Sequence, residues 1–378
     1  MQKIRILLVG AGGYGELYVR LLARNELETP CEWVGVVDPY AKRSGEWGRI
    51  EAAGVPVYDA LDEFYAEHEA DLAIISTPIP LHAPQCIAAM EHGSDVLLEK
   101  PIAGSSGIAR EIIAARDRLQ KKLFIGYQWC YDAAMLRFKQ ASDAGRFGRL
   151  RRLRSLVLWP RGFDYYARNN WAGRALVNGQ PVYDSVSSNA TAHYLFNMLW
   201  IAGPDYAGAA PAQCQAVTAK ANDVETFDTA GMLFTLENGV EALHLASHAA
   251  GTAHKQEPMF VYEYEKAVVR FGGLGELPGH ITAEFADGTT EDFGQSVLQG
   301  EHKLNQVLKA LVDPSLPVIC PAEAAVKHTQ AIELARQVCP EAKRFARIDR
   351  EEGGLWVDGL AERMIRAFED FRLPDLDL

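Results

Sequence analysis

The sequence predicts an α/β protein in which a doubly wound parallel sheet precedes an α+β domain with a large, mostly antiparallel, open sheet. Short apolar segments alternate with helical segments over roughly the first 125 residues, the pattern of a parallel sheet covered by helices. Beyond residue 126 the apolar segments lengthen, and turn signals such as Gly272-Gly273 separate them. The length of 378 residues also exceeds one typical core. We therefore expect two domains, residues 1–125 and 126–378.

The first domain is expected to consist of short buried strands joined by helices. Residues 4–9 are apolar apart from one arginine, which is typical of a strand buried on both faces of a parallel sheet. Further strands are expected at residues 33–37, 72–75, 96–98 and 123–126, and helices at about 16–24, 84–92 and 107–120.

The second domain is expected to be rich in longer strands. They are predicted at residues 153–159, 215–219, 230–236, 240–247, 260–264, 267–271 and 281–285. Helices are expected near residues 184–201, 300–312 and 321–338, and a helical tail over 354–378.

The amino-acid composition indicates which partners and which cellular compartment to expect. A net charge of −12 argues against a nucleic-acid partner, because phosphate binding needs a basic face. No apolar run reaches the ~18 residues that span a bilayer, so we expect no membrane. The six cysteines show no CxxC spacing, which fits reduced thiols rather than disulfides or a zinc site. The first residues lead straight into a strand, so we expect no signal peptide and a cytoplasmic protein.

A glycine motif at the start of the first domain predicts a dinucleotide site. Gly10, Gly12 and Gly15 form the pattern G-x-G-x-x-G, with Gly13 and Tyr14 between them, after a strand and before a helix. The first glycine allows a tight turn, the second lets the backbone approach a pyrophosphate, and the third allows close helix–strand packing. The N–H groups of the helix start then face the phosphates.

Asp38 ends the second predicted strand and bears on the choice of dinucleotide. A carboxylate there accepts hydrogen bonds from the adenosine ribose and repels a 2′-phosphate, so NAD is favoured. Lys42 and Arg43 follow closely, which leaves NADP as the alternative.

Lys100, in Glu99-Lys100-Pro101, is the candidate catalytic cation. It follows a predicted strand of the parallel sheet, and ligands bind at the carboxyl ends of such strands. An ammonium group there would stabilise a developing alkoxide and position the substrate hydroxyl. A lysine in a low-polarity cleft can also take part in proton transfer. The alternative is a surface lysine in a turn.

His193 is the candidate base. Ser185, Asn189 and His193 recur every four residues in a predicted helix, so they would share one face and line a cleft. A histidine titrates near neutrality and could take the hydroxyl proton as hydride leaves carbon. From spacing alone, a buried core histidine is the stronger interpretation.

A polar and aromatic segment around residues 159–174 suits a sugar or a hydroxy acid, although a structured loop would fit equally well. We expect substrate contacts from Arg161, Asn170 and Trp171, together with Trp129 and Asp184. Four residues of strand would separate His244 from His248 by roughly 13 Å, too far for one zinc ion. We therefore expect no metal.

These features resemble the Gfo/Idh/MocA family of NAD(P)-dependent oxidoreductases over roughly residues 3–340. The resemblance rests on the glycine motif, Asp38-Pro39, Ser76-Thr77-Pro78 with His82, Glu99-Lys100-Pro101, and His193 ahead of Gly203. It implies oxidation or reduction of hydroxyl and carbonyl groups on sugars, inositols and similar polyols. It also implies a Rossmann domain paired with a domain whose open sheet often forms an oligomer interface, hence a homodimer or homotetramer. It implies that Lys100 and His193 are catalytic. It also implies that six residues lie along the cofactor: Tyr14, Thr77, Pro78, His82, Glu99 and Gln128.

Asn189 departs from the family pattern, which usually has an aspartate four residues before the histidine. An amide can hold a hydroxyl but cannot act as a base. Acid–base work would then fall to His193 and Lys100, or to Asp184. Two alternatives to a dehydrogenase therefore stay open: an enzyme that holds NAD tightly and oxidises a sugar transiently to allow elimination, and a non-enzymatic regulator that binds NAD and a sugar.

Overall fold

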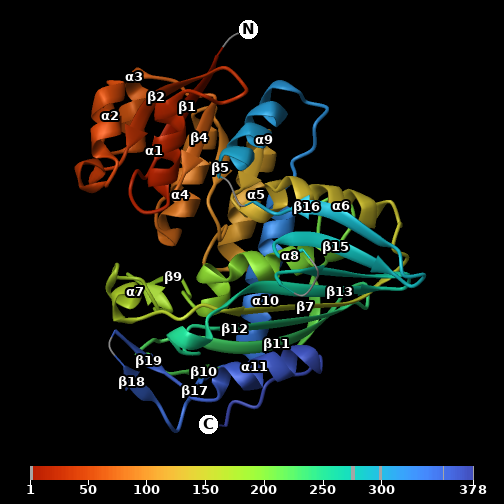
Figure 1. Ribbon diagram of the computed structural model, residues 1–378. Helices are drawn as coiled ribbons and strands as arrows, with labels where there is room; N and C mark the ends of the chain where they lie inside the picture. Colours follow the sequence, from red (N-terminus) through yellow and green to blue (C-terminus); the bar gives the residue numbers. More distant parts are fainter. Residues whose placement is uncertain (1–2, 274–276, 298–299, 352, 378) are drawn as a thin grey trace. The chain divides into compact units, whose positions relative to one another are not determined.

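The computed structural model describes residues 3–377, apart from 274–276, 298–299 and 352. The chain divides into two compact units, Met1–Asp132 with Leu298–Val326, and Ala133–Val297 with Lys327–Leu378. The first contains a six-stranded sheet and the second a nine-stranded sheet (Figure 1). This confirms the predicted fold class.

The sheet of the first unit is entirely parallel and runs in the order β3-β2-β1-β4-β5-β6. The order changes direction between β1 and β4, which makes the sheet doubly wound. Its strands are β1 (Ile4–Val9), β2 (Cys31–Val37), β3 (Val57–Tyr58), β4 (Leu72–Ile75), β5 (Asp95–Leu98) and β6 (Leu123–Ile125). The sequence did not predict β3, because a two-residue strand carries no periodic signal.

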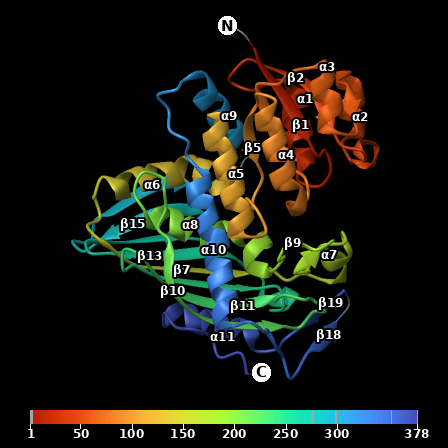
Figure 2. The same ribbon diagram turned by 180° about the vertical axis from the view of Figure 1, so that it is seen from behind.

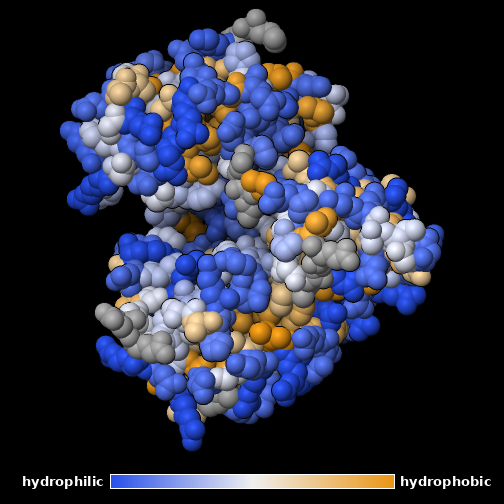
Figure 3. Space-filling model, in the orientation of Figure 1, coloured by the Kyte–Doolittle hydropathy of each residue, from blue (hydrophilic) through white to orange (hydrophobic). Residues whose placement is uncertain are grey.

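Helices cover both faces of this sheet, as right-handed crossovers on either side of the switch point require. Helix α1 packs with α2 and α9, and α4 packs with α3 and α5 (Figures 1 and 2). Over this unit the surface is mostly hydrophilic, with separate hydrophobic spots (Figure 3). The helices are α1 (Gly15–Arg24), α2 (Trp47–Ala53), α3 (Leu61–Glu67), α4 (Ile79–Glu91), α5 (Ser106–Leu119) and α9 (Gly300–Val312), with short turns η1 (Ala41–Arg43) and η2 (Gln128–Tyr131).

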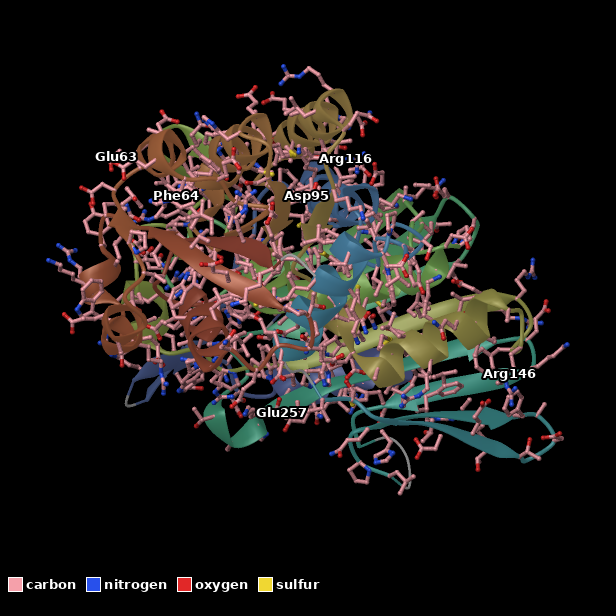
Figure 4. The ribbon with its side chains drawn as sticks, turned by 90° about the horizontal axis from the view of Figure 1, so that it is seen from above. Glu63, Phe64, Asp95, Arg116, Arg146 and Glu257 are labelled. Atoms are coloured by element: carbon pink, nitrogen blue, oxygen red, sulfur yellow. The ribbon has the colours of Figure 1, made fainter. Side chains whose placement is uncertain are left out.

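A late segment of the chain returns to this unit and is tied to it by hydrogen bonds. The Ile125 N–H donates to the Cys320 carbonyl at 3.0 Å, beside the edge strand β6. Arg116 on α5 (Figure 4) binds the Glu323 carboxylate through both terminal nitrogens, at 3.0 and 2.5 Å. Helix α9 is therefore part of the same compact body as the glycine motif.

The sheet of the second unit is mixed and mostly antiparallel, in the order β16-β15-β14-β13-β7-β12-β11-β10-β17. Only the pairs β12–β7 and β10–β17 are parallel within this sheet as described. Its strands are β7 (Leu150–Leu158), β10 (Pro211–Lys220), β11 (Thr229–Leu236), β12 (Glu241–Ser247), β13 (Gln256–Tyr264), β14 (Ala267–Phe271), β15 (His280–Phe285), β16 (Thr290–Gln295) and β17 (Lys343–Arg344).

Alternate residues of these strands pack against different helices, because side chains point to opposite faces of a sheet. On one face Tyr262 of β13 contacts Phe138 of α6 (Ala133–Asp143) and Asn197 of α8 (Ala192–Ala202). On the other face Leu156 and Leu243 join a buried cluster with α11 (Leu360–Glu369). Figures 1 and 2 show α11 and α8 on opposite sides of the strands. The chain thus covers part of its own sheet with α11.

The predicted helical tail is only partly helical. A hairpin of β18 (Asp349–Glu351) and β19 (Gly354–Trp356) precedes α11, so the expectation of helix from residue 354 was wrong. The remaining elements are α7 (Phe163–Ala167), β8 (Leu176–Val177), β9 (Gln180–Pro181), η3 (Val186–Ala190), η4 (Thr252–His254) and α10 (Ala322–Val338). None of the described helices is long and apolar enough to cross a membrane.

Candidate active site

The strands of the first unit end in register, so the residues after them form one row. The last residues of adjacent strands pair: Val37 with Val9, Val9 with Ile75, Ile75 with Leu98, and Leu98 with Ile125. The next N–H along each strand donates to its neighbour's last carbonyl at 2.8–3.0 Å. Because ligands bind at this edge of open α/β sheets, the candidate residues begin here: Gly10, Asp38, Ser76, Glu99 and Gly126.

The glycine motif has the geometry that each glycine was predicted to provide. Gly10 has φ +87°, and a Cβ there would lie 2.8 Å from the Ser76 carbonyl oxygen. A Cβ on Gly15 would lie 2.1 Å from the Gly10 carbonyl oxygen, so helix α1 approaches the strand closely. Gly12 and Gly13 are exposed and have nothing within 4 Å of such an atom. The loop is therefore closed on its inner side and open on the side where a pyrophosphate would lie.

Tyr14 precedes α1 and joins the loop to the far end of the sheet. Its hydroxyl donates to Gln128 Oε1 at 2.8 Å, so two residues predicted along the cofactor are brought together. Tyr14 is the N-cap residue of α1, and its side chain makes no capping hydrogen bond to the N–H groups of the first turn. Such a helix start suits an anion, and these residues fit a dinucleotide.

Asp38 is held beside the glycine loop. Its two carboxylate oxygens accept hydrogen bonds from the N–H groups of Ala11 at 2.8 Å and Tyr40 at 2.7 Å. A carboxylate has about four lone-pair sites, so this arrangement leaves capacity for a ribose diol. Lys42 and Arg43 lie over Trp47 and Tyr40, at 6.0 and 4.7 Å from the ring centroids.

His82 lies behind the loops that follow β4 and β5. It is buried, with one ring nitrogen 2.9 Å from the Thr77 carbonyl oxygen and the other 3.0 Å from that of Pro101. Burial lowers its pKa, although the two carbonyls favour the charged form. Pro78 is exposed and precedes α4, while the Thr77 hydroxyl donates to Gln85. His82 thus fixes the backbone on both sides of the row.

Glu99 lies in a buried network that the sequence analysis missed. Its Oε1 accepts a hydrogen bond from the Tyr18 hydroxyl at 2.6 Å and forms an ion pair with Lys303 of α9. Its other oxygen accepts from the Lys100 N–H at 3.2 Å. Lys303 also lies 3.4 Å from the Tyr14 hydroxyl. The network therefore connects the glycine loop to the candidate catalytic lysine within one unit.

The ionisation of this network follows from its burial. Burial alone would lower the pKa of Lys303, but Glu99 and Tyr14 outweigh it, and the pKa lies above the usual value. Burial and Glu99 raise the pKa of Tyr18 well above its usual value. Near neutral pH Lys303 is therefore a cation and Tyr18 keeps its hydroxyl proton. The signal for Lys303 was its place in the apolar stripe of α9, with Leu304, Val307 and Leu308.

The second unit carries the other candidate catalytic residues at a broken helix. The predicted continuous helix over 184–201 was wrong: η3 is a π-helical segment over Val186–Ala190, and α8 begins only at Ala192. Ser185 does not share a cleft-facing stripe, because its side chain caps η3 by accepting from the Ser188 N–H. Single π-helical turns are frequent at functional sites, because they offset the side chains on either side.

Asn189 and Asp184 are in direct contact. The Asn189 amide nitrogen donates to Asp184 Oδ1 at 2.8 Å, while Oδ2 accepts from the Gly173 N–H at 2.7 Å. Arg168 lies 3.6 Å from the same carboxylate. Asp184 is buried and thus acts as an anchor for Asn189 and for the preceding loop. His193 lies in the first turn of α8 and is partly exposed.

The predicted substrate residues lie in different surroundings. Trp129 lies on η2 in the first unit and is buried. In the second unit Arg161 and Trp171 are partly exposed and Asn170 is exposed, in the loops before and after α7. Arg161 lies over the rings of Trp159 and Tyr165, at 5.6 and 5.0 Å.

His244 lies on β12, whereas His248 follows the end of this strand rather than belonging to it as predicted, and both are buried. His244 Nδ1 lies 2.9 Å from the Ser155 hydroxyl, and burial, with His328, lowers its pKa to about 3. His248 Nδ1 lies 3.0 Å from the Tyr166 hydroxyl. Among the described residues, no group of three or more histidines, cysteines or acidic residues could hold a metal ion.

These features define an α/β dinucleotide-binding protein with a second, sheet-based domain. Two family sequence models match the chain: "Oxidoreductase family, NAD-binding Rossmann fold" over residues 4–127, and "GFO/IDH/MocA C-terminal domain" over residues 135–270. The chain belongs to the GFO/IDH/MocA oxidoreductase family, and its first domain is an NAD-binding Rossmann domain.

The individual curated proteins that match this chain share about a third of its sequence or less, over part of its length. An inositol 2-dehydrogenase of Rubrobacter xylanophilus is 29% identical over 149 residues, which cover 39% of this chain and 42% of that protein. An inositol 2-dehydrogenase of Rhodococcus jostii is 33% identical over 153 residues, which cover 39% of this chain and 40% of that protein. The chain thus spans about two fifths of the length of the curated relatives it matches.

Solved structures agree in fold over nearly the whole chain. The WlbA dehydrogenase of Bordetella pertussis, solved with NADH and UDP-GlcNAcA, has a TM-score of 0.71 at 21% identity, covering 90% of this chain and 97% of its own. At these identities the likeness shows the fold alone.

Proposed function

We propose that the protein is an NAD-dependent dehydrogenase that acts on a secondary hydroxyl, or the corresponding carbonyl, of a sugar, inositol or related polyol. The observation that carries the proposal is the row at the carboxyl edge of the parallel sheet. It combines a glycine loop open toward a pyrophosphate with Lys100, the second residue after β5. Relatives named inositol 2-dehydrogenase support the substrate class.

The proposed roles follow from the chemistry of each side chain. Bound NAD would accept the hydride from the substrate carbon. Lys100 would hold the substrate oxygen and stabilise negative charge on it. His193 would take the hydroxyl proton. Asn189 donates through its nitrogen to Asp184, so its oxygen is the atom that would accept from a substrate hydroxyl.

Asp38 supports NAD over NADP as the preferred cofactor. Two backbone N–H groups hold its carboxylate beside the glycine loop, where it would oppose a 2′-phosphate. Tyr14, Thr77, Pro78, His82, Glu99 and Gln128 are proposed to lie along the cofactor or to position the backbone that does.

The state of the protein in the cell is also a proposal. We propose a cytoplasmic homo-oligomer, a dimer or a tetramer, in line with six free cysteines of which four are buried. Any subunit interface would use a surface other than the part of the sheet that α11 covers. Light scattering after gel filtration measures the mass directly.

The first test is NADH formation at 340 nm against sugars, inositols and sugar acids, with NAD and NADP in parallel. We expect turnover with NAD, and Lys100→Met should abolish it while NAD binding by calorimetry stays near that of the wild type. Full turnover by the Lys100→Met variant would refute the assigned role. Cofactor that copurifies and never accumulates as free NADH would favour the transient-oxidation alternative. NAD binding without turnover of any substrate would favour the regulator, which Asn189 motivates.

A further inference from the structure

Arg161, after β7 in the second unit, carries a guanidinium that lacks the partner its neighbours have. Its Nε is buried and has no hydrogen-bond partner among the described residues. Arg168 lies 3.6 Å from Asp184, and Arg174 lies 2.7 Å from Glu225. A buried donor without a protein partner is a group that a bound ligand would satisfy.

Aromatic rings and the backbone fix the position of Arg161. Its guanidinium lies between Trp159 and Tyr165, and its backbone N–H donates to the His248 carbonyl at 3.0 Å. Arg168 lies over the same Tyr165 ring at 3.7 Å. A planar cation held against aromatic faces is ordered before a ligand arrives, so less entropy is lost on binding.

The cluster is continuous with the candidate catalytic helix of the same unit. The Trp159 ring meets the Tyr194 ring edge-on at 5.6 Å, and Tyr194 follows His193 on α8. On the other side Arg168 faces Asp184, which holds Asn189. Arg161 is therefore connected to the proposed base, His193, through the rings of Trp159 and Tyr194.

Each anion near this cluster has a partner other than Arg161. Asp184 lies 3.6 Å from Arg168, Glu257 pairs with Lys255, and Asp228 accepts hydrogen bonds from Asn222. Lys255 lies 2.5 Å from Glu257, which also accepts from Trp159 Nε1 at 3.0 Å. Burial, together with Arg161 and Arg168, lowers the pKa of His248 well below its usual value, so this histidine adds no charge near neutrality.

The Arg161 guanidinium is a planar fork of donors whose neighbouring anions are bound elsewhere, so it matches a monoanion. A carboxylate accepts two parallel hydrogen bonds from a guanidinium, and this pairing is among the strongest available to arginine.

We propose that Arg161 binds a carboxylate of the substrate, so that the preferred substrate is an acidic sugar, such as a uronate or an aldonate, rather than a neutral polyol. The proposal rests on the dehydrogenase function proposed above and names its substrate class. The hydroxyl that is oxidised then belongs to a molecule anchored at its acid group, and His193 meets a hydroxyl further along the same chain or ring.

The test compares matched pairs of neutral and acidic sugars, glucose with glucuronate and galactose with galacturonate, at saturating NAD. We expect the wild-type protein to prefer the acid in kcat/KM. In Arg161→Gln the ratio of acid to neutral kcat/KM should fall by about 10- to 100-fold, the range for a lost charged hydrogen bond. Arg161→Lys should recover part of that loss. Arg174→Gln, which removes an exposed arginine that is already paired, is the matched control and should leave the ratio within about two-fold.

A wild-type preference for neutral sugars, or an acid-to-neutral ratio that Arg161→Gln does not change, would overturn the inference and leave the dehydrogenase assignment intact. Absence of turnover with every sugar would instead count against the proposed function. In that case glucuronate and galacturonate are titrated calorimetrically in the presence of NADH. Binding that weakens at least ten-fold in Arg161→Gln supports the carboxylate site, and equal binding, or none by the wild type, refutes it. Thermal unfolding of each variant confirms that it is folded.

Discussion

Lys303 and Glu99 form an ion pair inside the first unit, although 204 positions separate them in the chain. The Lys303 side chain is fully buried, and only 8% of the Glu99 side chain is exposed. Tyr18 and the Lys100 N–H complete the surroundings of the carboxylate. Removing one member of such a pair leaves an uncompensated buried charge.

The first prediction concerns this pair. Lys303→Met should lower the free energy of unfolding by about 3–5 kcal/mol in urea denaturation at neutral pH. The double variant Lys303→Met/Glu99→Gln should lose less than the sum of its single changes, because no charge is left alone. Lys309→Met, on the same helix but in an exposed pair with Glu28, should cost less than about 1 kcal/mol. Strictly additive losses in the double variant would contradict the coupling.

The second prediction separates two glycines of one loop. Gly12 has open space around it, so Gly12→Ala should leave thermal stability unchanged and weaken NAD binding more than about ten-fold by blocking the close approach of the pyrophosphate. Gly15→Ala should destabilise the fold itself, because its Cβ would overlap the Gly10 carbonyl oxygen. Calorimetric titration with NAD and thermal unfolding measure both effects. Equal NAD affinity in Gly12→Ala would disprove the predicted path of the cofactor.

The third prediction concerns the departure at Asn189. Asn189→Asp would place a carboxylate at hydrogen-bonding distance from Asp184, and like charges this close raise the pKa of the pair. The pKa of the carboxylate pair is then higher in the folded than in the unfolded protein. The loss in the free energy of unfolding is therefore small at low pH and grows as the pH rises through the folded pKa. Relative to wild type, we expect a loss of about 1–3 kcal/mol at pH 8 and less at pH 5. The exchanged variant Asn189→Asp/Asp184→Asn keeps one carboxylate and one amide and should recover part of the loss.

The fourth prediction concerns acid stability. Burial holds the pKa of His244 near 3, whereas the unfolded chain takes up that proton near pH 6.5. Since the unfolded state binds the proton first, stability is complete above about pH 6.5 and falls by about 1.4 kcal/mol per pH unit below it. At pH 5 the loss from this residue is about 2 kcal/mol. His244→Gln should show a flatter decline from pH 6.5 to 5 in urea denaturation, and an unchanged slope would argue against a neutral buried imidazole.

The fifth prediction concerns the helix that covers the sheet. Phe368 on α11 is buried against the cluster that includes Leu156 and Leu243, so Phe368→Ala should cost about 3–5 kcal/mol. Glu369→Ala, the next residue along the helix and exposed, should change stability by less than about 0.5 kcal/mol. Urea denaturation measures both. Similar effects from the two changes would mean that α11 is not held by its apolar side.

The sequence predicted best those features that depend on local order. Strands β1, β4 and β14 and helix α9 have the predicted bounds, because their apolar runs are short and bounded by clear turn residues. The inner geometry of the glycine loop was also predictable, since Gly10 is required by a contact with the segment after the neighbouring strand and Gly15 by a contact with Gly10.

The parts that could not be predicted depend on contacts between distant segments or on small differences in helical hydrogen bonding. The apolar stripe of α9 indicates that Lys303 is buried, but its partner Glu99 becomes known only when α9 is placed in the fold. The π-helical turn at Val186–Ala190 differs from an α-helix by one position in its hydrogen bonds, and the Thr191 N–H bonds to the Val186 carbonyl. The four-residue spacing from Asn189 to His193 cannot reveal that change. Strand β16 lacks a run of apolar residues and depends on its partner β15.

Because α11 covers one face of the sheet, that face is completed only late in the synthesis of the chain. Strand β7 is complete at Leu158, and the helix that buries its apolar side begins only at Leu360. While the ribosome produces the intervening chain, Leu156, Leu243 and their neighbours are exposed to water and to other nascent chains. Until α11 has been synthesised, the apolar face of the sheet is uncovered, and we expect a chaperone to bind it during that time.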